Sequence, residues 1–123
     1  MARILVIDDE AIVRGAIVRM LAPCGYDVVE ASSAAAGLRL WREARADVLV
    51  TDIALPDMTG FELIGLLRSE GETVPIIAIS GSLVVSDLGM VADRLGIAQL
   101  LAKPFSPDQL VSAVSTALAD KAP

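Results

Sequence analysis

The sequence predicts an α/β protein in which one parallel β-sheet is covered by helices on both faces. Two observations carry this prediction. Short apolar runs rich in valine and isoleucine recur along the 123-residue chain, and amphipathic helical patterns separate them. The runs are almost continuously hydrophobic, which is typical of strands buried on both faces, and their spacing of about 20 to 25 residues leaves room for crossover helices.

Five strands are expected, each followed by a helix. The strands are expected at residues of about 3–8, 27–31, 47–52, 75–80 and 98–102. The helices are expected at about 10–22, 33–44, 59–70, 86–95 and 106–119. Because no linker, repeat or change in composition interrupts this alternation, residues 1–123 are expected to form a single domain.

Capping patterns place the starts of the third and fifth helices. Thr59 precedes Glu62 by the three-residue spacing of a capping box. Ser106 precedes Gln109 by the same spacing, and Pro107 suits the first position of a helix. The third helix should therefore start near residue 60 and the fifth near residue 107.

Two glycines bear on the end of the first helix and on the stability of the fourth. Gly25 lies where a left-handed residue is expected to end the first helix. Gly89 lies inside the fourth helix, where it costs about 1 kcal/mol relative to alanine. The apolar stripe expected to face the core from this helix consists of Leu88, Val91, Ala92 and Leu95.

An apolar run, Leu83 to Val85, falls in the loop expected before the fourth helix. Packing against the local core is the favoured interpretation. The alternative is a contact with a partner or with a second copy of the chain, in a weak homodimer, because contiguous exposed apolar residues mark interfaces.

The high apolar content does not indicate a membrane protein. Hydrophobic residues make up 54% of the chain and the mean hydropathy is +0.63, but the longest uncharged run, between Glu72 and Asp87, has 14 residues and contains Pro75 and Gly81. A membrane span needs roughly 20 apolar residues. Acidic residues follow the first apolar run at once, unlike in a signal peptide, so a cytoplasmic location without membrane insertion is expected.

Charge and residue usage exclude several classes of function. The net charge of −6 and the isoelectric point near 4.4 argue against direct binding of nucleic acid. Cys24 is the only cysteine and histidine is absent. An internal disulfide, a multi-cysteine metal site and histidine-based catalysis are therefore excluded.

Polar residues gather at the carboxyl ends of the expected strands. Asp8 and Asp9 follow the first strand, Asp52 ends the third, Ser80 ends the fourth, and Lys103 follows the fifth. Ligands of open parallel α/β sheets bind at this edge, so we expect one site. Converging carboxylates repel by roughly 4 kcal/mol per pair at about 4 Å, which favours a divalent cation, and all-oxygen ligands point to Mg²⁺ or Mn²⁺.

Phosphate chemistry follows from this set of groups. Asp52 can attack phosphorus as a nucleophile, while Lys103, one of only two lysines, and the Ser80 hydroxyl can bind phosphoryl oxygens. Each residue alone has a plainer interpretation: the acid pair and Asp52 as turn or cap residues, Ser80 as a loop start and Lys103 as a solvated side chain. Their combination in this order is what is specific.

Four motifs, ILVIDDE, DIALPDMTGFEL, IIAISG and LLAKPF, together resemble the receiver domain of two-component response regulators, from Arg3 to about Ala119. The resemblance implies a flavodoxin-like (βα)5 fold with strand order 2-1-3-4-5. It also implies that Asp52 is the phosphoacceptor and that Lys103 contacts the phosphoryl group.

The resemblance assigns further roles. Asp9 would bind Mg²⁺ directly and Asp8 through a metal-bound water, with the Ala54 carbonyl and Asp52 as additional ligands. Ser80 fills the position of the switch hydroxyl, which turns toward the phosphoryl group. The peptide between Lys103 and Pro104 is commonly cis in the family. Leu100 departs from the family pattern, because this position often holds an aromatic residue that couples the switch to the output face.

The implied function is a phosphorylation switch, not an enzyme beyond catalysing its own phosphorylation and dephosphorylation. The phosphodonor would be a sensor histidine kinase or a histidine phosphotransfer protein, and the target an unknown protein. A degenerate receiver that acts without phosphorylation is an alternative, as is, less favourably, an aspartate-nucleophile phosphatase, whose D-x-D motif is absent. A nucleotide-binding domain ranks lower because no glycine-rich phosphate loop follows the first strand. The chain is expected to be a free receiver or an excised N-terminal one.

Overall fold

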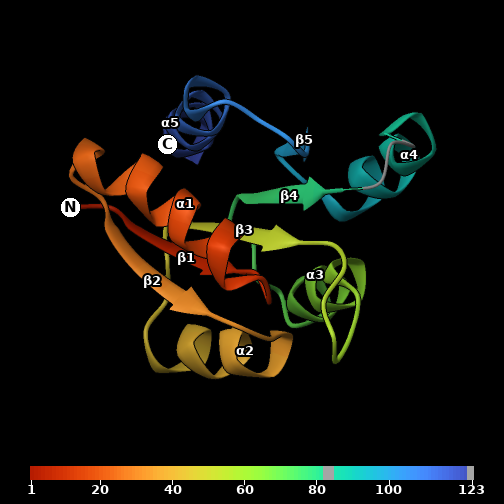
Figure 1. The fold of residues 1–123 in the computed structure, drawn as a ribbon. Helices are drawn as coiled ribbons and strands as arrows, with labels where there is room; N and C mark the ends of the chain where they lie inside the picture. Colours follow the sequence, from red (N-terminus) through yellow and green to blue (C-terminus); the bar gives the residue numbers. More distant parts are fainter. Residues whose placement is uncertain (82–84, 122–123) are drawn as a thin grey trace.

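One parallel sheet contains β1 (Arg3–Ile7), β2 (Asp27–Ala31), β3 (Val48–Asp52), β4 (Ile76–Ser80) and β5 (Gln99–Ala102). The strand order is β2-β1-β3-β4-β5 in this computed structural model (Figure 1), which confirms the predicted flavodoxin-like (βα)5 fold. The structure describes residues 1–81 and 85–121, and the side chains of residues 82–89 and 121 lie outside this description.

A helix follows each strand. The helices are α1 (Ala11–Leu21), α2 (Ala34–Glu43), α3 (Gly60–Ser69), α4 (Val85–Leu95) and α5 (Pro107–Lys121), and a short 3-10 turn, η1 (Ala22–Cys24), follows α1. Helices α1 and α5 cover one face of the sheet, and α2 and α3 cover the other (Figure 1). Helix α4 packs beside α3 and β5.

Alternating side chains of each central strand supply the two layers of the core. In β1, Ile4 and Val6 pack under α1 and α5, whereas Leu5 and Ile7 pack under α2 and α3. Burial on both faces is therefore correct for β1, β3 and β4. It is wrong for β2 and β5, whose residues are mostly half-buried, because these strands form the edges of the sheet.

The predicted caps are present. The Thr59 hydroxyl accepts a hydrogen bond from the Glu62 N–H, and the Glu62 carboxylate accepts one from the Thr59 N–H. Ser106 and Gln109 make the same pair of bonds before α5. Gly25 is left-handed, with φ of 85°, but it closes the 3-10 turn η1, because the chain tightens after Leu21 before it turns into β2.

The expected apolar stripe of α4 faces the core only in part. Ala92 is buried and Leu95 packs against the core below α2 and α3, but Val91 is 37% exposed. Of the run from Leu83 to Val85, the first two residues lie outside the described residues and the third begins α4. Within the described part of the chain, no helix has the length and apolar character to cross a membrane.

Candidate functional site

The polar residues predicted at the strand ends lie along one edge of the sheet. Strands β1, β3, β4 and β5 are successive neighbours, so the ends of these strands place Asp8, Asp52, Ser80 and Lys103 side by side. A cavity of about 260 Å³ opens there. Its lining consists of Glu10, Asp52, Ile53, Ala54, Ser80, Gly81 and Lys103.

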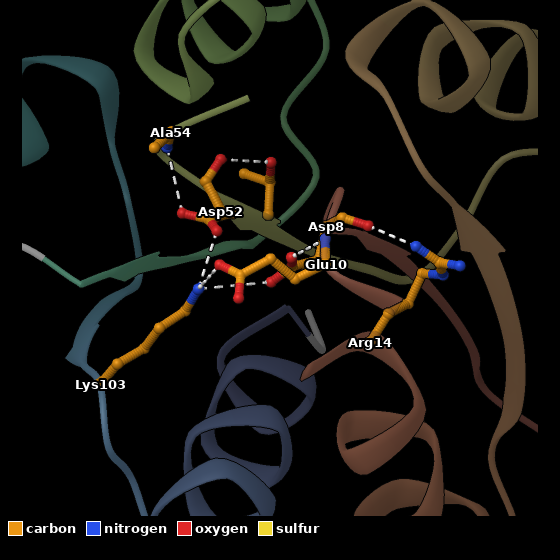
Figure 2. Close-up of polar contacts among 7 residues, drawn as sticks. Asp8, Glu10, Arg14, Asp52, Ala54 and Lys103 are labelled. Carbon is orange, nitrogen blue, oxygen red and sulfur yellow. Dashed lines mark hydrogen bonds and ion pairs between the residues drawn. The ribbon is translucent and has the colours of Figure 1, made fainter. Parts of the chain in front are cut away.

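Lys103 is the cation of this cavity. Its Nζ lies 2.8 Å from Oδ2 of Asp52, 3.6 Å from Oδ2 of Asp8 and 3.6 Å from Oε1 of Glu10 (Figure 2). Burial lowers the pKa of Lys103, but the ion pairs, of which that with Asp52 is the strongest, outweigh burial and raise the pKa overall. The ammonium is therefore protonated and holds the carboxylates together.

The carboxylate of Asp52 is buried and held at both oxygens. Oδ2 receives the ammonium of Lys103, and Oδ1 accepts a hydrogen bond of 3.0 Å from the Ala54 N–H. Asp52 itself is only 3% exposed, yet it lines the cavity. Its side chain is thus fixed in place and open toward a ligand.

Asp8 is fully buried and has one oxygen to offer. Oδ1 accepts a hydrogen bond of 2.8 Å from the Glu10 N–H, whereas Oδ2 is a buried atom without a hydrogen-bond partner among the described residues. Burial raises the pKa of Asp8. The Lys103 ammonium lies 3.6 Å from this oxygen, too far for a hydrogen bond, and a buried carboxylate oxygen without a hydrogen bond is costly unless a closer cation or a cation-bound water reaches it.

These residues fit a divalent cation. One ligand atom from each of Asp8, Asp9, Glu10 and Asp52 can be chosen so that all lie within 4.8 Å of one another. Carboxylate oxygens are ligands that Mg²⁺ accepts, and Mg²⁺ keeps several waters, so the exposed Asp9 beside the buried Asp8 suits a partly hydrated ion. The Oδ2 atom of Asp8, which is buried without a hydrogen bond, points to the same occupant.

The backbone of the acid pair is held by Arg14, which the sequence analysis did not identify. Nη1 of Arg14 donates a hydrogen bond of 2.7 Å to the Asp8 carbonyl (Figure 2), and Nε binds Glu30 of β2 at 3.2 Å. The arginine lies in the first turn of α1, which begins at Ala11. No local motif marks it, because its partner Glu30 is 16 residues away.

Gly60 allows α3 to start against the end of β3. Its N–H donates a hydrogen bond of 2.6 Å to the Ile53 carbonyl. A Cβ atom at Gly60 would lie 2.5 Å from the Asp52 carbonyl oxygen and 2.8 Å from Cα of Ile53. Glycine is therefore required for the close approach that positions the Asp52 backbone.

Asp57 ties the loop after β3 to the N-terminus of α2. Its Oδ2 accepts a hydrogen bond of 2.8 Å from the Ala35 N–H, and its Oδ1 accepts one of 3.1 Å from the Ala34 N–H. These bonds lower the pKa of Asp57. The loop that carries Ala54 is thereby anchored at two points, by the Gly60 N–H and by the Asp57 carboxylate.

Ser80 belongs to the cavity, whereas Leu100 and Pro104 do not line it. Ser80 is 4% exposed, and its carbonyl accepts a hydrogen bond of 2.8 Å from the Lys103 N–H. Leu100 is half-buried in β5 and pairs with Ala78 of β4. The peptide between Lys103 and Pro104 is cis.

Ala54 contributes its N–H to Asp52. Glu10 lines the cavity as well, although no sequence motif singled it out.

Comparison with known proteins matches this chain to one family. The model of the response regulator receiver domain matches residues 4–115. The transcriptional regulatory protein KdpE of Mycobacterium tuberculosis is 36% identical over 96% of this chain and 51% of its own length. The chain spans about half the length of the first curated relatives it matches.

Solved structures agree with the sequence matches. A response regulator receiver domain protein from Clostridium thermocellum has a TM-score of 0.89 and 29% identity, with 98% of this chain and 97% of that one covered. The chemotaxis response regulator CheY4 of Vibrio cholerae has a TM-score of 0.87 and 29% identity, with 96% and 99% covered. On its sequence, its fold and the carboxyl-edge site, the chain belongs to the response regulator receiver domains of two-component signalling.

Proposed function

We propose that this domain accepts a phosphoryl group on Asp52 in a Mg²⁺-dependent reaction. The observation that carries the proposal is the arrangement of Asp52, whose buried carboxylate lies 2.8 Å from the Lys103 ammonium and faces a cavity large enough for a phosphoryl group. Asp8, Asp9 and Asp52 would hold the metal ion, and the Ala54 carbonyl is the further ligand in this proposal. Mn²⁺ is the other cation that this donor set accepts.

The reaction forms an acyl phosphate. A carboxylate oxygen of Asp52 attacks the phosphorus of a phosphohistidine donor, and the new P–O bond forms as the P–N bond of the donor breaks. The imidazole nitrogen of the donor keeps the electron pair and takes up a proton from solvent. The Lys103 ammonium is placed to bind a phosphoryl oxygen. Bound Mg²⁺ supplies positive charge against the transferred group.

The phosphodonor in this proposal is a phosphohistidine of another protein. Residues 1–123 contain no histidine, so the phosphohistidine lies outside this domain, and we place it on a partner. A sensor histidine kinase and a histidine phosphotransfer protein are the two partners proposed. Both present the phosphoryl group on an imidazole, and both reach Asp52 through the same opening.

The output is proposed to be a change in protein contacts. The Ser80 hydroxyl lies at the end of β4, where it can turn toward a phosphoryl group on Asp52, and the segment leading to α4 follows directly. A doubly charged group on Asp52 biases that movement. The names of the relatives point to transcription for KdpE and to chemotaxis for CheY4, and the downstream target of this domain is proposed to be a protein.

Intact mass after incubation with Mg²⁺ and acetyl phosphate tests the phosphoacceptor. We expect the wild-type chain to gain one phosphoryl group and to gain none when Mg²⁺ is removed by a chelator. Asp52→Asn should gain none, whereas Asp93→Asn, which changes an exposed acid in α4, should react as the wild type does. A gain in Asp52→Asn equal to that of the wild type would contradict the assignment.

The same reaction separates the competing functions. A phosphorylation-independent receiver would gain no phosphate under any of these conditions. A phosphatase would release phosphate catalytically from a general phosphomonoester, such as p-nitrophenyl phosphate, and we expect no such turnover.

A further inference from the structure

Among the residues that the structure describes, Glu10 is the one carboxylate lining the cavity that is both close to Lys103 and open to solvent. Its Oε1 lies 3.6 Å from Nζ of Lys103, and its side chain is 61% exposed (Figure 2). Asp8 and Asp52, the other carboxylates near this ammonium, have side chains that are 1% and 4% exposed. Glu10 therefore stands at the mouth of the cavity, whereas Asp52 lines it from a buried position and Asp8 lies buried beside Lys103.

The position of Glu10 has two electrostatic consequences. An incoming phosphoryl group carries negative charge and enters a cavity that the Glu10 carboxylate lines together with Asp52, so the two repel. The same group must also bind Lys103, whose ammonium is already paired with Glu10. Both effects oppose the entry of a free anion. Because the side chain is exposed, it can rotate away at small cost when a larger molecule displaces it.

We propose that Glu10 is a specificity-determining residue of this site, which discriminates against small, free anionic phosphodonors and leaves access to donors carried by a protein. The proposal rests on the phosphoacceptor function of Asp52. A docked partner has binding energy from the rest of its interface to offset the repulsion at the cavity mouth, and it can move Glu10 off Lys103. A small phosphodonor has no such contacts.

A metal-ligand role for Glu10 makes the opposite prediction. A ligand oxygen of Glu10 falls within the same 4.8 Å group as those of Asp8, Asp9 and Asp52. If Glu10 bound Mg²⁺, its neutralisation would weaken Mg²⁺ binding and slow phosphorylation. If Glu10 screens the cavity, neutralisation speeds phosphorylation and leaves Mg²⁺ affinity within about twofold of the wild type. The pairing with Lys103 and the exposure of the side chain favour the second role.

The experiment compares Glu10→Gln with the wild-type chain, because glutamine keeps the shape and removes the charge. Phosphorylation rates are measured by intact mass at saturating Mg²⁺ with acetyl phosphate, a dianion near neutral pH, and with phosphoramidate, a monoanion. We expect Glu10→Gln to react about threefold to tenfold faster with the dianion, with a smaller gain for the monoanion and a gain that shrinks as salt is added.

Glu43→Gln is the matched control. It removes the same charge from the last residue of α2, where Glu43 lines a separate cavity with Arg3 at the opposite edge of the sheet. This variant should react at the wild-type rate with both donors. A gain in Glu43→Gln equal to that in Glu10→Gln would trace the effect to net charge and overturn the proposal.

The outcomes distinguish this proposal from the phosphoacceptor function. If the wild type gains phosphate and Glu10→Gln reacts no faster, Glu10 does not screen the site and the phosphoacceptor function stands. A clear loss of Mg²⁺ affinity in Glu10→Gln, measured by calorimetry, would likewise overturn the screening role. If neither protein gains phosphate, the phosphoacceptor function fails, and binding of the phosphoryl analogue beryllofluoride, followed by ¹⁹F NMR, decides the role of Glu10: tighter binding to Glu10→Gln supports it and equal binding overturns it.

Discussion

Arg14 donates a hydrogen bond of 2.7 Å to the main-chain carbonyl of Asp8, and so a side chain of α1 fixes the backbone from which the buried carboxylate projects. The same guanidinium binds Glu30 of β2, so β1, α1 and β2 are joined at one point beside the site. The side chain of Arg14 is only 19% exposed, whereas that of Glu30 is 47% exposed, so the bond to the Asp8 carbonyl is the better shielded of the two contacts. We infer that Arg14 positions the acid pair.

Arg14→Ala should weaken Mg²⁺ binding by about tenfold, as loss of a group that orients metal ligands commonly does. Isothermal titration calorimetry with Mg²⁺ gives the affinity. Arg42→Ala is the control, because it removes a more exposed guanidinium whose partner, Glu70, is also at the surface. Equal affinities for Arg14→Ala and Arg42→Ala would contradict a positioning role.

Two glycines of α3 should respond in opposite ways to alanine. At Gly60 the added Cβ meets backbone atoms of Asp52 and Ile53 at 2.5 and 2.8 Å, so the strand end or the helix start must shift, at a cost of about 1–3 kcal/mol in the free energy of unfolding. At Gly65 no described atom of a neighbouring element lies within 4 Å of the added Cβ, and alanine should stabilise the helix by up to about 1 kcal/mol. Urea unfolding measures both, and a Gly60→Ala protein as stable as Gly65→Ala would refute the packing argument.

The stability conferred by Lys103 should disappear at high pH. Because the ion pairs with Asp52, Asp8 and Glu10 raise its pKa above the ordinary 10.5, the folded state holds this proton more tightly than the unfolded state. The resulting stabilisation is complete below pH 10.5 and is lost as the pH rises through the raised pKa. Lys103→Gln should therefore be less stable than the wild type at pH 7, and the difference in the free energy of unfolding between the two proteins should narrow above pH 10.5.

Urea unfolding in the presence of a chelator, at pH 7, 9 and 11, checks this pH dependence. Lys121→Gln serves as the control, because it removes the only other lysine, which is at the end of α5. A gap for Lys103→Gln that is constant across this range would show that the ion pairs do not carry the stabilisation.

Leu100 should limit how far activation spreads from the site. It is half-buried in β5, three residues before Lys103, and carries neither an aromatic ring nor a hydroxyl. On addition of beryllofluoride and Mg²⁺, amide NMR shifts should be large around Ser80 and small on the face formed by α4, β5 and α5. Leu100→Tyr should enlarge the second set, and equal shifts in both regions of the wild type would contradict this expectation.

The sheet could be predicted because its information is local. Runs such as Ile4 to Ile7 alternate with helical patterns, and the capping residues around Thr59 and Ser106 lie three positions apart, so neighbouring residues alone indicate the elements. The half-burial of β2 and β5 could not be predicted, because it depends on which strands form the edges of the sheet. The exposure of Val91 could not be predicted either, because it depends on how α4 is rotated against the sheet.

The site residues divide in the same way. Asp8, Asp52, Ser80 and Lys103 could be placed together from their positions at strand ends, since parallel strands bring their carboxyl ends to one edge. The residues that support the site, Arg14 and Asp57, could not be predicted in this way. The bonds of Arg14 to Glu30 and of Asp57 to α2 join residues 16 to 23 positions apart, without any spacing rule that links them.

Because Lys103 follows β5, the site is complete only when this last strand has joined the sheet. Asp8 and Asp52 come from β1 and β3, but their cation comes from the far edge of the sheet. A chain cut before Gln99 would bring the same carboxylates together with no ammonium between them, and any divalent cation would then have to balance their charge alone. A ligand that needs Lys103 binds only the complete sheet, so its presence would shift the folding equilibrium toward the form in which β5 has joined β4.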